Sequence, residues 1–237
     1  MRPVLLITGA TSSIGAAVAR RMAATHDIAL ATRTREGDAR TLAASLPCHA
    51  TVHGAALGEP GAAAALVARV VGAMGRLDAM ALVHGTVAPR DPLDADLSAT
   101  AREIAVNLIA PMELVAAGAR HMRPGSAVVA VSSVNAEAAP PGAAGFAASK
   151  AGLEGAVRAL ARDHAGQGIR VNAVQPGAVR RDRHPHPPEV VAAFTAQTWL
   201  GGIAEPDDVA GPIAFLLSDD ARWITGEVLR VAGGFRR

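Results

Sequence analysis

The 237-residue chain contains no tyrosine, a single cysteine and a single lysine, and only 3% of its residues are aromatic. Without tyrosine, no phenolic hydroxyl is present to donate a proton in a reaction. A lone cysteine, Cys48, excludes an internal disulfide, and because no other ligand clusters with it, we do not expect it to bind a metal. Every basic residue but one of the 23 is arginine, so the lysine, Lys150, stands out as a candidate functional residue.

Long apolar runs and a strong charge excess are also missing. Polar residues such as Thr8, Arg20 and Asp27 interrupt every run before it reaches the roughly 18 residues that a membrane span needs. The first residues lack the apolar core and cleavage site of a signal peptide, so we expect a cytoplasmic protein without a membrane partner. Lys and Arg total 23 against 21 Asp and Glu, and a formal net charge of +2 is no signature of nucleic-acid binding.

Apolar runs alternate with segments of helical spacing along the whole chain. Half of the residues (50%) are hydrophobic and 19% are charged, which suits one folded domain covering residues 1–237. Because the expected strands are apolar on both faces, the pattern predicts an α/β fold of Rossmann type, a doubly wound parallel sheet with helices on both faces. The expected strands are 3–8, 28–32, 50–53, 79–83, 127–131, 169–174 and 227–231, and the expected helices are 14–24, 38–46, 60–74, 98–121, 145–164 and 207–217.

A glycine-containing turn, Thr-Gly-Ala-Thr-Ser-Ser-Ile-Gly (8–15), joins the first expected strand to the first expected helix, where a Rossmann sheet binds a dinucleotide. The first glycine permits a tight turn, the last lets the helix approach the strand, and the helix N-terminus with two serine hydroxyls suits a pyrophosphate. The other interpretation is a plain turn in which a serine only caps the helix. The candidate cofactor-binding residues here are Gly9, Thr11, Ser12, Ser13, Ile14 and Gly15.

The second expected strand is not followed by the acidic residue that would bind the ribose 2′-hydroxyl of NAD. It runs instead into Ala-Thr-Arg-Thr-Arg (31–35). Arg33, with Thr32 or Arg35 as a helper, could pair with a 2′-phosphate through its planar guanidinium. The segment therefore favours NADP(H) over NAD(H), and a solvated surface arginine is the plainer alternative.

Motifs farther along the chain match a known family. Asn107 lies in the long central helix, Ser132-Ser133 end the fifth strand, Phe146-Ala-Ala-Ser-Lys opens the next helix, and segments 170–177 and 224–234 read RVNAVQPG and ITGEVLRVAGG. Over almost the whole chain this order resembles the short-chain dehydrogenase/reductase family, and it is most similar to 3-oxoacyl-acyl-carrier-protein reductases. The resemblance implies an NADP-dependent oxidoreductase that reduces a ketone and assembles as a homodimer or homotetramer.

The resemblance also assigns catalytic positions. In the family, tyrosine gives a proton to the carbonyl oxygen, serine hydrogen-bonds that oxygen, lysine holds the nicotinamide ribose and lowers the tyrosine pKa, and asparagine organises a water chain to the lysine. The matching positions are Ser133, Phe146, Lys150 and Asn107, so the usual acid is absent. Lys150 follows Phe146 by one helical turn and shares its face. Cofactor contacts are further implied for Gly85, Lys150, Pro176 and Gly177.

Other positions depart from the family pattern. Where the family has Asn-Asn-Ala-Gly after the fourth strand, this chain has Leu-Val-His-Gly (82–85). Ser13 replaces the middle glycine of the first turn, and Ala56 replaces the acidic residue after the third strand. Arg181 replaces the threonine that follows Pro-Gly. The missing acid could be replaced by an ordered water, by an acidic hydroxyl of the substrate, or by a nearby side chain. The candidate side chains, none of them favoured, are His84, Asn135, Glu137 and Gln175.

Residues 180–188, Arg-Arg-Asp-Arg-His-Pro-His-Pro-Pro, form the one irregular stretch and occupy the position of the family's substrate lid. Their positive charges could receive a carboxylate, a phosphopantetheine phosphate or an acidic carrier protein, or could simply be solvated. No cluster of carboxylates or cysteines accompanies His184 and His186, so no metal site is expected.

Three functions remain open. The first is an atypical NADP-dependent reductase of a ketone or related unsaturated group, on a small or carrier-bound substrate of polyketide-like or fatty-acid-like metabolism. The second is a silent homologue that binds cofactor or stabilises an active reductase in a hetero-oligomer. The third is a lyase or isomerase with a decayed cofactor site, which the changes at Ser13, Ala56 and Val83 would fit.

Overall fold

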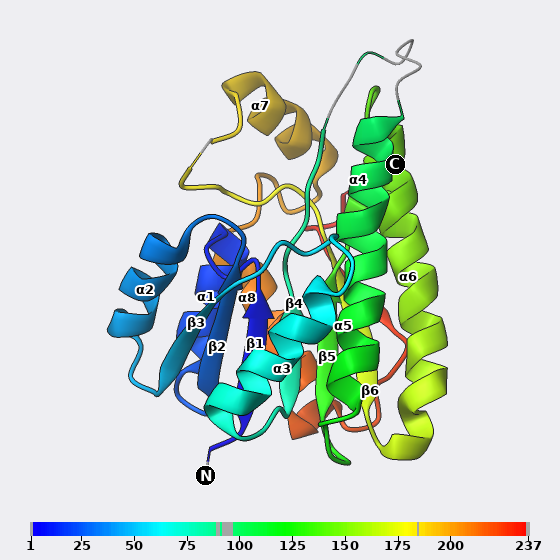
Figure 1. The fold of residues 1–237 in the computed structure, drawn as a ribbon. Coiled ribbons are helices and arrows are strands. Elements are labelled where there is room, and N and C mark those ends of the chain that lie inside the picture. Colours follow the sequence, from blue (N-terminus) through cyan, green and yellow to red (C-terminus); the bar gives the residue numbers. More distant parts are fainter. Residues whose placement is uncertain (1, 89–90, 92–96, 184, 236–237) are drawn as a thin grey trace.

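The computed structural model describes residues 2–88, 91, 97–183 and 185–235. Within these residues, seven parallel strands form one sheet in the order β3-β2-β1-β4-β5-β6-β7, with helices on both faces (Figure 1). This order is that of a doubly wound Rossmann sheet, and it confirms the predicted fold class. The strands are β1 (Val4–Thr8), β2 (Asp27–Thr32), β3 (Ala50–Gly54), β4 (Ala79–Leu82), β5 (Ala127–Val131), β6 (Arg170–Pro176) and β7 (Val228–Val231).

Two apolar cores lie on the two faces of the sheet. Side chains alternate along each strand, so Leu5 and Ile7 of β1 point to one core while Val4 and Leu6 point to the other. The first core is covered by α1 (Ser13–Met22), α2 (Glu36–Ser45) and α8 (Pro206–Leu217), and the second by α3 (Ala62–Met74), α5 (Ala110–Ala119) and α6 (Ala144–His164). The central strands β1, β4, β5 and β6 are buried at every position. The apolar runs of β1, β4 and β5 predict this burial, whereas β6 also buries Arg170, Asn172 and Gln175.

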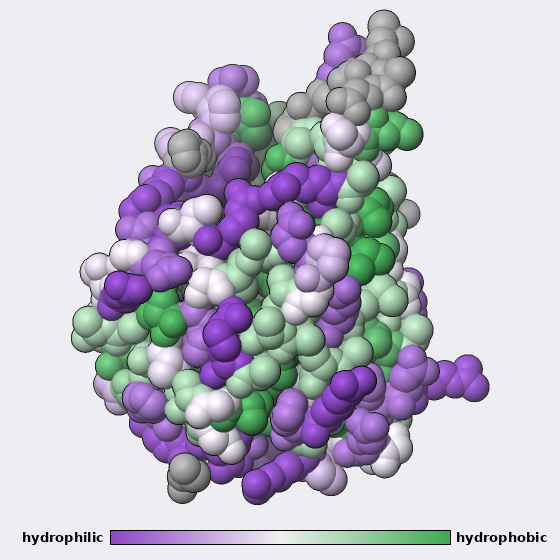
Figure 2. Space-filling view, in the orientation of Figure 1, coloured by the Kyte–Doolittle hydropathy of each residue, from purple (hydrophilic) through white to green (hydrophobic). Residues whose placement is uncertain are grey.

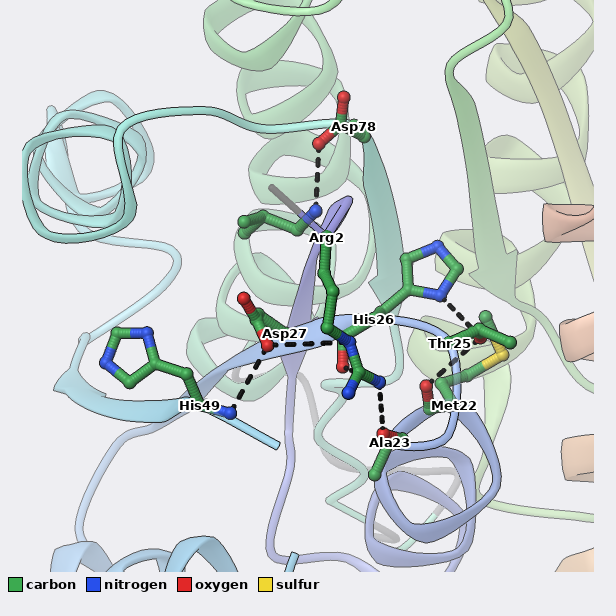
Figure 3. Close-up of polar contacts among 9 residues, drawn as sticks. Arg2, Met22, Ala23, Thr25, His26, Asp27, His49 and Asp78 are labelled. Atoms are coloured by element: carbon green, nitrogen blue, oxygen red, sulfur yellow. Dashed lines mark hydrogen bonds and ion pairs between the residues drawn. The ribbon is translucent and has the colours of Figure 1, made fainter. Parts of the chain in front are cut away.

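Polar contacts fix the amino ends of the strands, at the edge of the sheet opposite the site described below (Figure 3). Arg2 donates a hydrogen bond to the carbonyl of His26 at 3.2 Å, and its Nε lies 3.7 Å from the carboxylate of Asp27. The Asp78 carboxylate accepts a hydrogen bond from the backbone N–H of Val4 at 2.8 Å. These contacts hold β1, β2 and β4 in register at one edge, and the loops at the carboxyl edge are left to form a binding site.

Two helical regions differ from the expected ones. The expected helix 98–121 consists of α4 (Ser98–Ile104), a π-helical turn η1 (Ala105–Ile109) and α5. A further helix, α7 (Pro188–Gln197), follows the irregular stretch and is absent from the expected elements. It begins with a proline at its first position, which is a common helix start because the missing N–H has no partner there in any case.

The outer surface is mixed. Figure 2 shows hydrophilic and hydrophobic residues interspersed over the face that carries α3, α5 and α6. In the described part of the chain, no helix combines the length and the apolar character that crossing a membrane requires.

Candidate active site

A cavity of about 1430 Å³ opens at the carboxyl ends of the strands. Its walls come from the turn after β1, the start of α2, the loops that follow β4, β5 and β6, and α7. Pockets for single small molecules typically measure roughly 300–1,000 Å³, so this cavity has room for a dinucleotide together with a second molecule.

The turn after β1 forms a cradle that only glycine permits. Gly9 has a φ of +64°, and a Cβ on Gly15 would lie 2.4 Å from the Gly9 carbonyl oxygen. Ser12 caps α1, because its Oγ accepts a hydrogen bond from Gly15 N at 3.1 Å and donates one to Gly9 O at 2.8 Å. Ser13 and Ile14 line the cavity, and their N–H groups have no carbonyl partner earlier in the helix. The cradle therefore fits a pyrophosphate, with Ser12 serving as the helix cap.

The two arginines after β2 occupy different places. Arg33 is exposed and is not among the residues that line the cavity. Arg35 does line it, together with Thr11 and Asp38. Its Nη1 donates to the backbone carbonyl of Thr11 at 2.9 Å, and its Nε donates to the Asp38 carboxylate at 2.7 Å. The structure thus brings Arg35 to the cofactor turn and leaves Arg33 at the surface.

Lys150 lies deep in the cavity wall and is only 4% exposed. Its Nζ donates a hydrogen bond to the Val131 carbonyl at 2.7 Å and lies 5.8 Å from the centre of the Phe146 ring. Burial lowers the lysine pKa to about 8, although the charge of Glu154, one turn farther along α6, opposes the shift. The hydrogen bond to Val131 leaves two hydrogens of the ammonium available to the cavity.

Asn107 is completely buried within the π-helical turn. Its Oδ1 accepts from Thr86 N at 2.8 Å, and its Nδ2 donates to Thr86 O at 2.8 Å and to Ser149 Oγ at 3.0 Å. A Cβ on Gly85 would lie 3.3 Å from Asn107 Oδ1 and 3.6 Å from Lys150 Nζ. Asn107 therefore fixes the loop after β4 against α6, close to the lysine.

Ser133 and Phe146 face the same cavity. The Ser133 Oγ accepts a hydrogen bond from Asn135 N at 3.2 Å, so its own O–H can be donated to a carbonyl oxygen in the cavity. The half-buried Phe146 ring has no proton to give. The loop after β6 contributes two further sequence-predicted residues to the lining, Pro176 and Gly177.

His84 is held inside the wall next to the cofactor turn. Its Nδ1 lies 2.6 Å from Thr8 Oγ1, and its Nε2 is the one buried side-chain nitrogen or oxygen of the described residues without a hydrogen-bond partner. Burial, and then the charge of Lys150, lower the histidine pKa to about 3. The imidazole is therefore neutral at physiological pH and offers no imidazolium proton there.

Two other side chains that were candidates to replace the missing acid, Glu137 and Gln175, are not part of the cavity lining. The Gln175 Nε2 donates to Glu154 at 2.9 Å and to Glu137 at 3.1 Å, while Ser132 Oγ donates to Glu154 at 2.6 Å. These bonds commit Gln175 and Glu137 to a polar network behind the site. Glu154 is not among the sequence-predicted site residues, although its spacing of four residues from Lys150 places the two on one helix face.

The stretch before α7 covers one side of the cavity. Arg181 and His186 both line it, and Arg181 Nη2 donates to His186 Nδ1 at 2.7 Å. The other ring nitrogen, Nε2, donates to Val179 O at 3.1 Å, so both nitrogens of His186 have partners. His184 lies outside the described residues. Across those residues, no group of three or more His, Cys, Asp or Glu side chains is placed to hold a metal ion.

The wall beyond this stretch is apolar. Phe194 of α7 and Phe235 near the C-terminus both line the cavity, with ring centres 5.5 Å apart. Val87 and Val190 also line the cavity. This part of the cavity suits the hydrocarbon body of a ligand.

Comparisons with known proteins agree with this geometry. The family model described as Enoyl-(Acyl carrier protein) reductase matches residues 9–236. The cis-4-hydroxycyclohexanecarboxylate dehydrogenase of Sinomonas cyclohexanicum is 32% identical over 98% of this chain and 96% of its own. A short chain dehydrogenase from Burkholderia cenocepacia J2315, solved in complex with NADP, has a TM-score of 0.93 and 32% identity over 98% of this chain and 97% of its own. The structure of the angucycline C-6 ketoreductase LanV with bound NADP has a TM-score of 0.92 and 30% sequence identity, and the match covers 98% of this chain and 95% of that chain. Matches of this extent show that the chain belongs to the short-chain dehydrogenase/reductase family.

Proposed function

We propose that the protein is an NADPH-dependent reductase that converts a ketone to an alcohol. The observation that carries the proposal is the convergence of the glycine cradle, the Ser133 hydroxyl and the Lys150 ammonium on one cavity. The cradle at Gly9 and Gly15 fits a pyrophosphate, and two relatives with this fold bind NADP. When bound, NADPH supplies a hydride, and Lys150 lies where its two remaining hydrogens could hold ribose hydroxyls.

The proton for the carbonyl oxygen is assigned to Lys150. His84 is neutral at physiological pH, and Glu137 and Gln175 are bonded behind the site. Lys150 is charged below a pKa of about 8 and becomes neutral above it, which is the range that a general acid needs. The carbonyl carbon accepts the hydride, the oxygen takes a proton from Nζ directly or through a water, and the neutral amine regains a proton from solvent.

Ser133 and the apolar wall position the substrate in this scheme. The Ser133 hydroxyl donates to the carbonyl oxygen and so polarises the bond that accepts the hydride. Phe194 and Phe235 favour a ketone with a hydrocarbon body, free or attached to a carrier, as in polyketide-like metabolism. The ketoreductase name of one relative supports this substrate class.

One observation favours a second candidate, a silent cofactor-binding homologue that stabilises an active partner. Phe146 occupies the cavity wall one turn before Lys150 and has no proton to give. If Lys150 serves only to hold NADPH, the protein binds the cofactor and reduces nothing.

A binding titration followed by a turnover assay separates these functions. NADPH and NADH are titrated against the wild type, Lys150→Met and the surface control Arg40→Ala, whose side chain is paired with Glu36 outside the cavity. We expect lysine-dependent NADPH binding and slow NADPH oxidation with apolar cyclic ketones. Binding without oxidation of any ketone would favour the silent homologue. Absence of nucleotide binding would refute both and leave a lyase or isomerase reaction.

A further inference from the structure

Glu154 of α6 is a buried carboxylate that has no part in the chemistry proposed above. It is 8% exposed and follows Lys150 by four residues, so the two side chains share the face of α6 that packs against β5 and β6 (Figure 1). Lys150 Nζ donates to the carbonyl of Val131, and Glu154 Oε1 accepts from Ser132 Oγ at 2.6 Å. Two consecutive residues at the end of β5 therefore hold the lysine and the carboxylate.

Uncharged groups fix the position of this carboxylate. Gln175 of β6 donates from Nε2 to the same oxygen of Glu154 at 2.9 Å, and its Oε1 accepts from Arg230 Nε at 2.7 Å. Arg230 also donates to Glu137 Oε2, so the charge of this arginine is paired with Glu137. Among the described residues, the ion pairs do not include Glu154. The network thus holds the carboxylate by hydrogen bonds and leaves its charge available to a neighbour.

The neighbour that needs this charge is the Lys150 ammonium. Removing a cation from water is costly unless an anion lies nearby, and the hydrogen bond of Lys150 goes to a neutral carbonyl. His84 after β4 is neutral at physiological pH and Asn107 of η1 has no charge, so neither compensates the cation. Glu154 does, because its charge opposes the effect of burial on the lysine pKa. It acts through space and leaves two hydrogens of the ammonium for the cavity.

We propose that Glu154 is a positioning residue, the buried counter-ion that keeps Lys150 charged while the free hydrogens of the ammonium remain available to the carbonyl oxygen of a substrate. The inference rests on the proposed function, since it explains how the proton donor is held ready for the reaction. Glu154 is not part of the cavity lining. It therefore acts only through the lysine.

NMR can test this directly, because Lys150 is the only lysine of the chain and gives a single signal. Full-length protein labelled with carbon-13 at the lysine Cε is titrated with pH, without cofactor or substrate. We expect Glu154→Gln to move the midpoint to lower pH by about one unit, the lower end of the effect of a nearby opposite charge. An amide oxygen can accept both of the bonds now made to Oε1, so the substitution changes the charge and keeps the contacts.

Three variants control this titration. Asp163→Asn removes a carboxylate from an exposed position of the same helix, so its midpoint should equal that of the wild type. Glu154→Asp keeps the charge and should retain most of the wild-type midpoint. Arg230→Gln changes an exposed residue and frees Glu137 from its partner, so the midpoint should rise by about 0.3 pH unit, as expected for weakly coupled charges. Thermal denaturation confirms that each variant is folded.

Steady-state profiles connect the charge to turnover. kcat of Glu154→Gln should begin to fall about one pH unit earlier than that of the wild type, so that it is about tenfold lower at about pH 9. A folded Glu154→Gln protein with the wild-type midpoint, or an Arg230→Gln protein whose midpoint does not rise, would overturn this inference alone. The expected midpoints without turnover of any ketone would support the counter-ion and overturn the proposed function.

Discussion

Introducing a tyrosine at position 146 tests which group donates the proton to the carbonyl oxygen. The Phe146 ring lies on the same helix face as Lys150, with its centre 5.8 Å from Nζ, so Phe146→Tyr adds a hydroxyl to the cavity beside a buried cation. A nearby positive charge favours the phenolate and lowers the tyrosine pKa from its ordinary value near 10. A positioned general acid contributes roughly 10²- to 10⁴-fold, which is about 3 to 5 kcal/mol of barrier.

The assay is the loss of NADPH absorbance with an apolar cyclic ketone, for the wild type, Phe146→Tyr and Phe146→Leu. Phe146→Leu removes the ring without adding a hydroxyl, so it shows how much of any change comes from space alone. We expect kcat to rise by about a hundredfold or more only in Phe146→Tyr, because the lysine already supplies a slower route in the wild type. A folded, NADPH-binding Phe146→Tyr protein that is no faster than the wild type would refute the assigned geometry of Phe146, Ser133 and Lys150.

Three further predictions concern single residues. Because the Lys150 pKa is lowered to about 8, wild-type kcat should fall as the pH rises through that value, and Lys150→Arg, which stays charged, should lose both the activity and this pH dependence, measured in steady-state profiles. Gly15→Ala places a Cβ 2.4 Å from a backbone oxygen, so urea denaturation should show a loss of about 3 kcal/mol, whereas Gly72→Ala, with nothing within 4 Å, should cost nothing. Asn107→Leu leaves two backbone groups of the loop after β4 without their partner, so it should lower the free energy of unfolding by about 3 kcal/mol and speed amide exchange in that loop.

The sheet could be predicted from the sequence because β1, β4 and β5 are buried on both faces and leave apolar runs. Helix α7 could not, because none of its residues is buried in the core and the prolines just before it and at its first position are typical of a loop. Several of its apolar side chains, such as Val190 and Phe194, line the cavity instead. The periodicity of apolar residues indicates burial against a core, so it does not readily predict a helix whose apolar side chains line a binding site.

The candidate site also combines contacts that the sequence predicts with contacts that it does not. Residues close in sequence are related by their spacing, which places Lys150 on the same helix face as Phe146 and relates Glu154 to Lys150 in the same way. Arg183 and Asp38 meet across 145 positions, and no local pattern predicts such a contact. The sequence also does not distinguish Arg33 from Arg35 as a cavity residue, because both follow β2 and only the path of the chain decides which one turns toward the cavity.

The π-helical turn at Ala105–Ile109 behaves as one extra residue accommodated inside an otherwise regular helix. Loss of a single residue there would let α4 and α5 merge into one uninterrupted helix, and because the π-helical turn absorbs that residue, the helical segments on either side would keep the faces that they present now. The residues of the turn itself would change position, so a one-codon deletion there could turn Asn107 away from the loop after β4 and disconnect that loop from α6 without altering any side chain at the reacting centre. Comparing homologues that differ in length at this turn would therefore show how strongly kcat depends on the contact between Asn107 and the loop after β4.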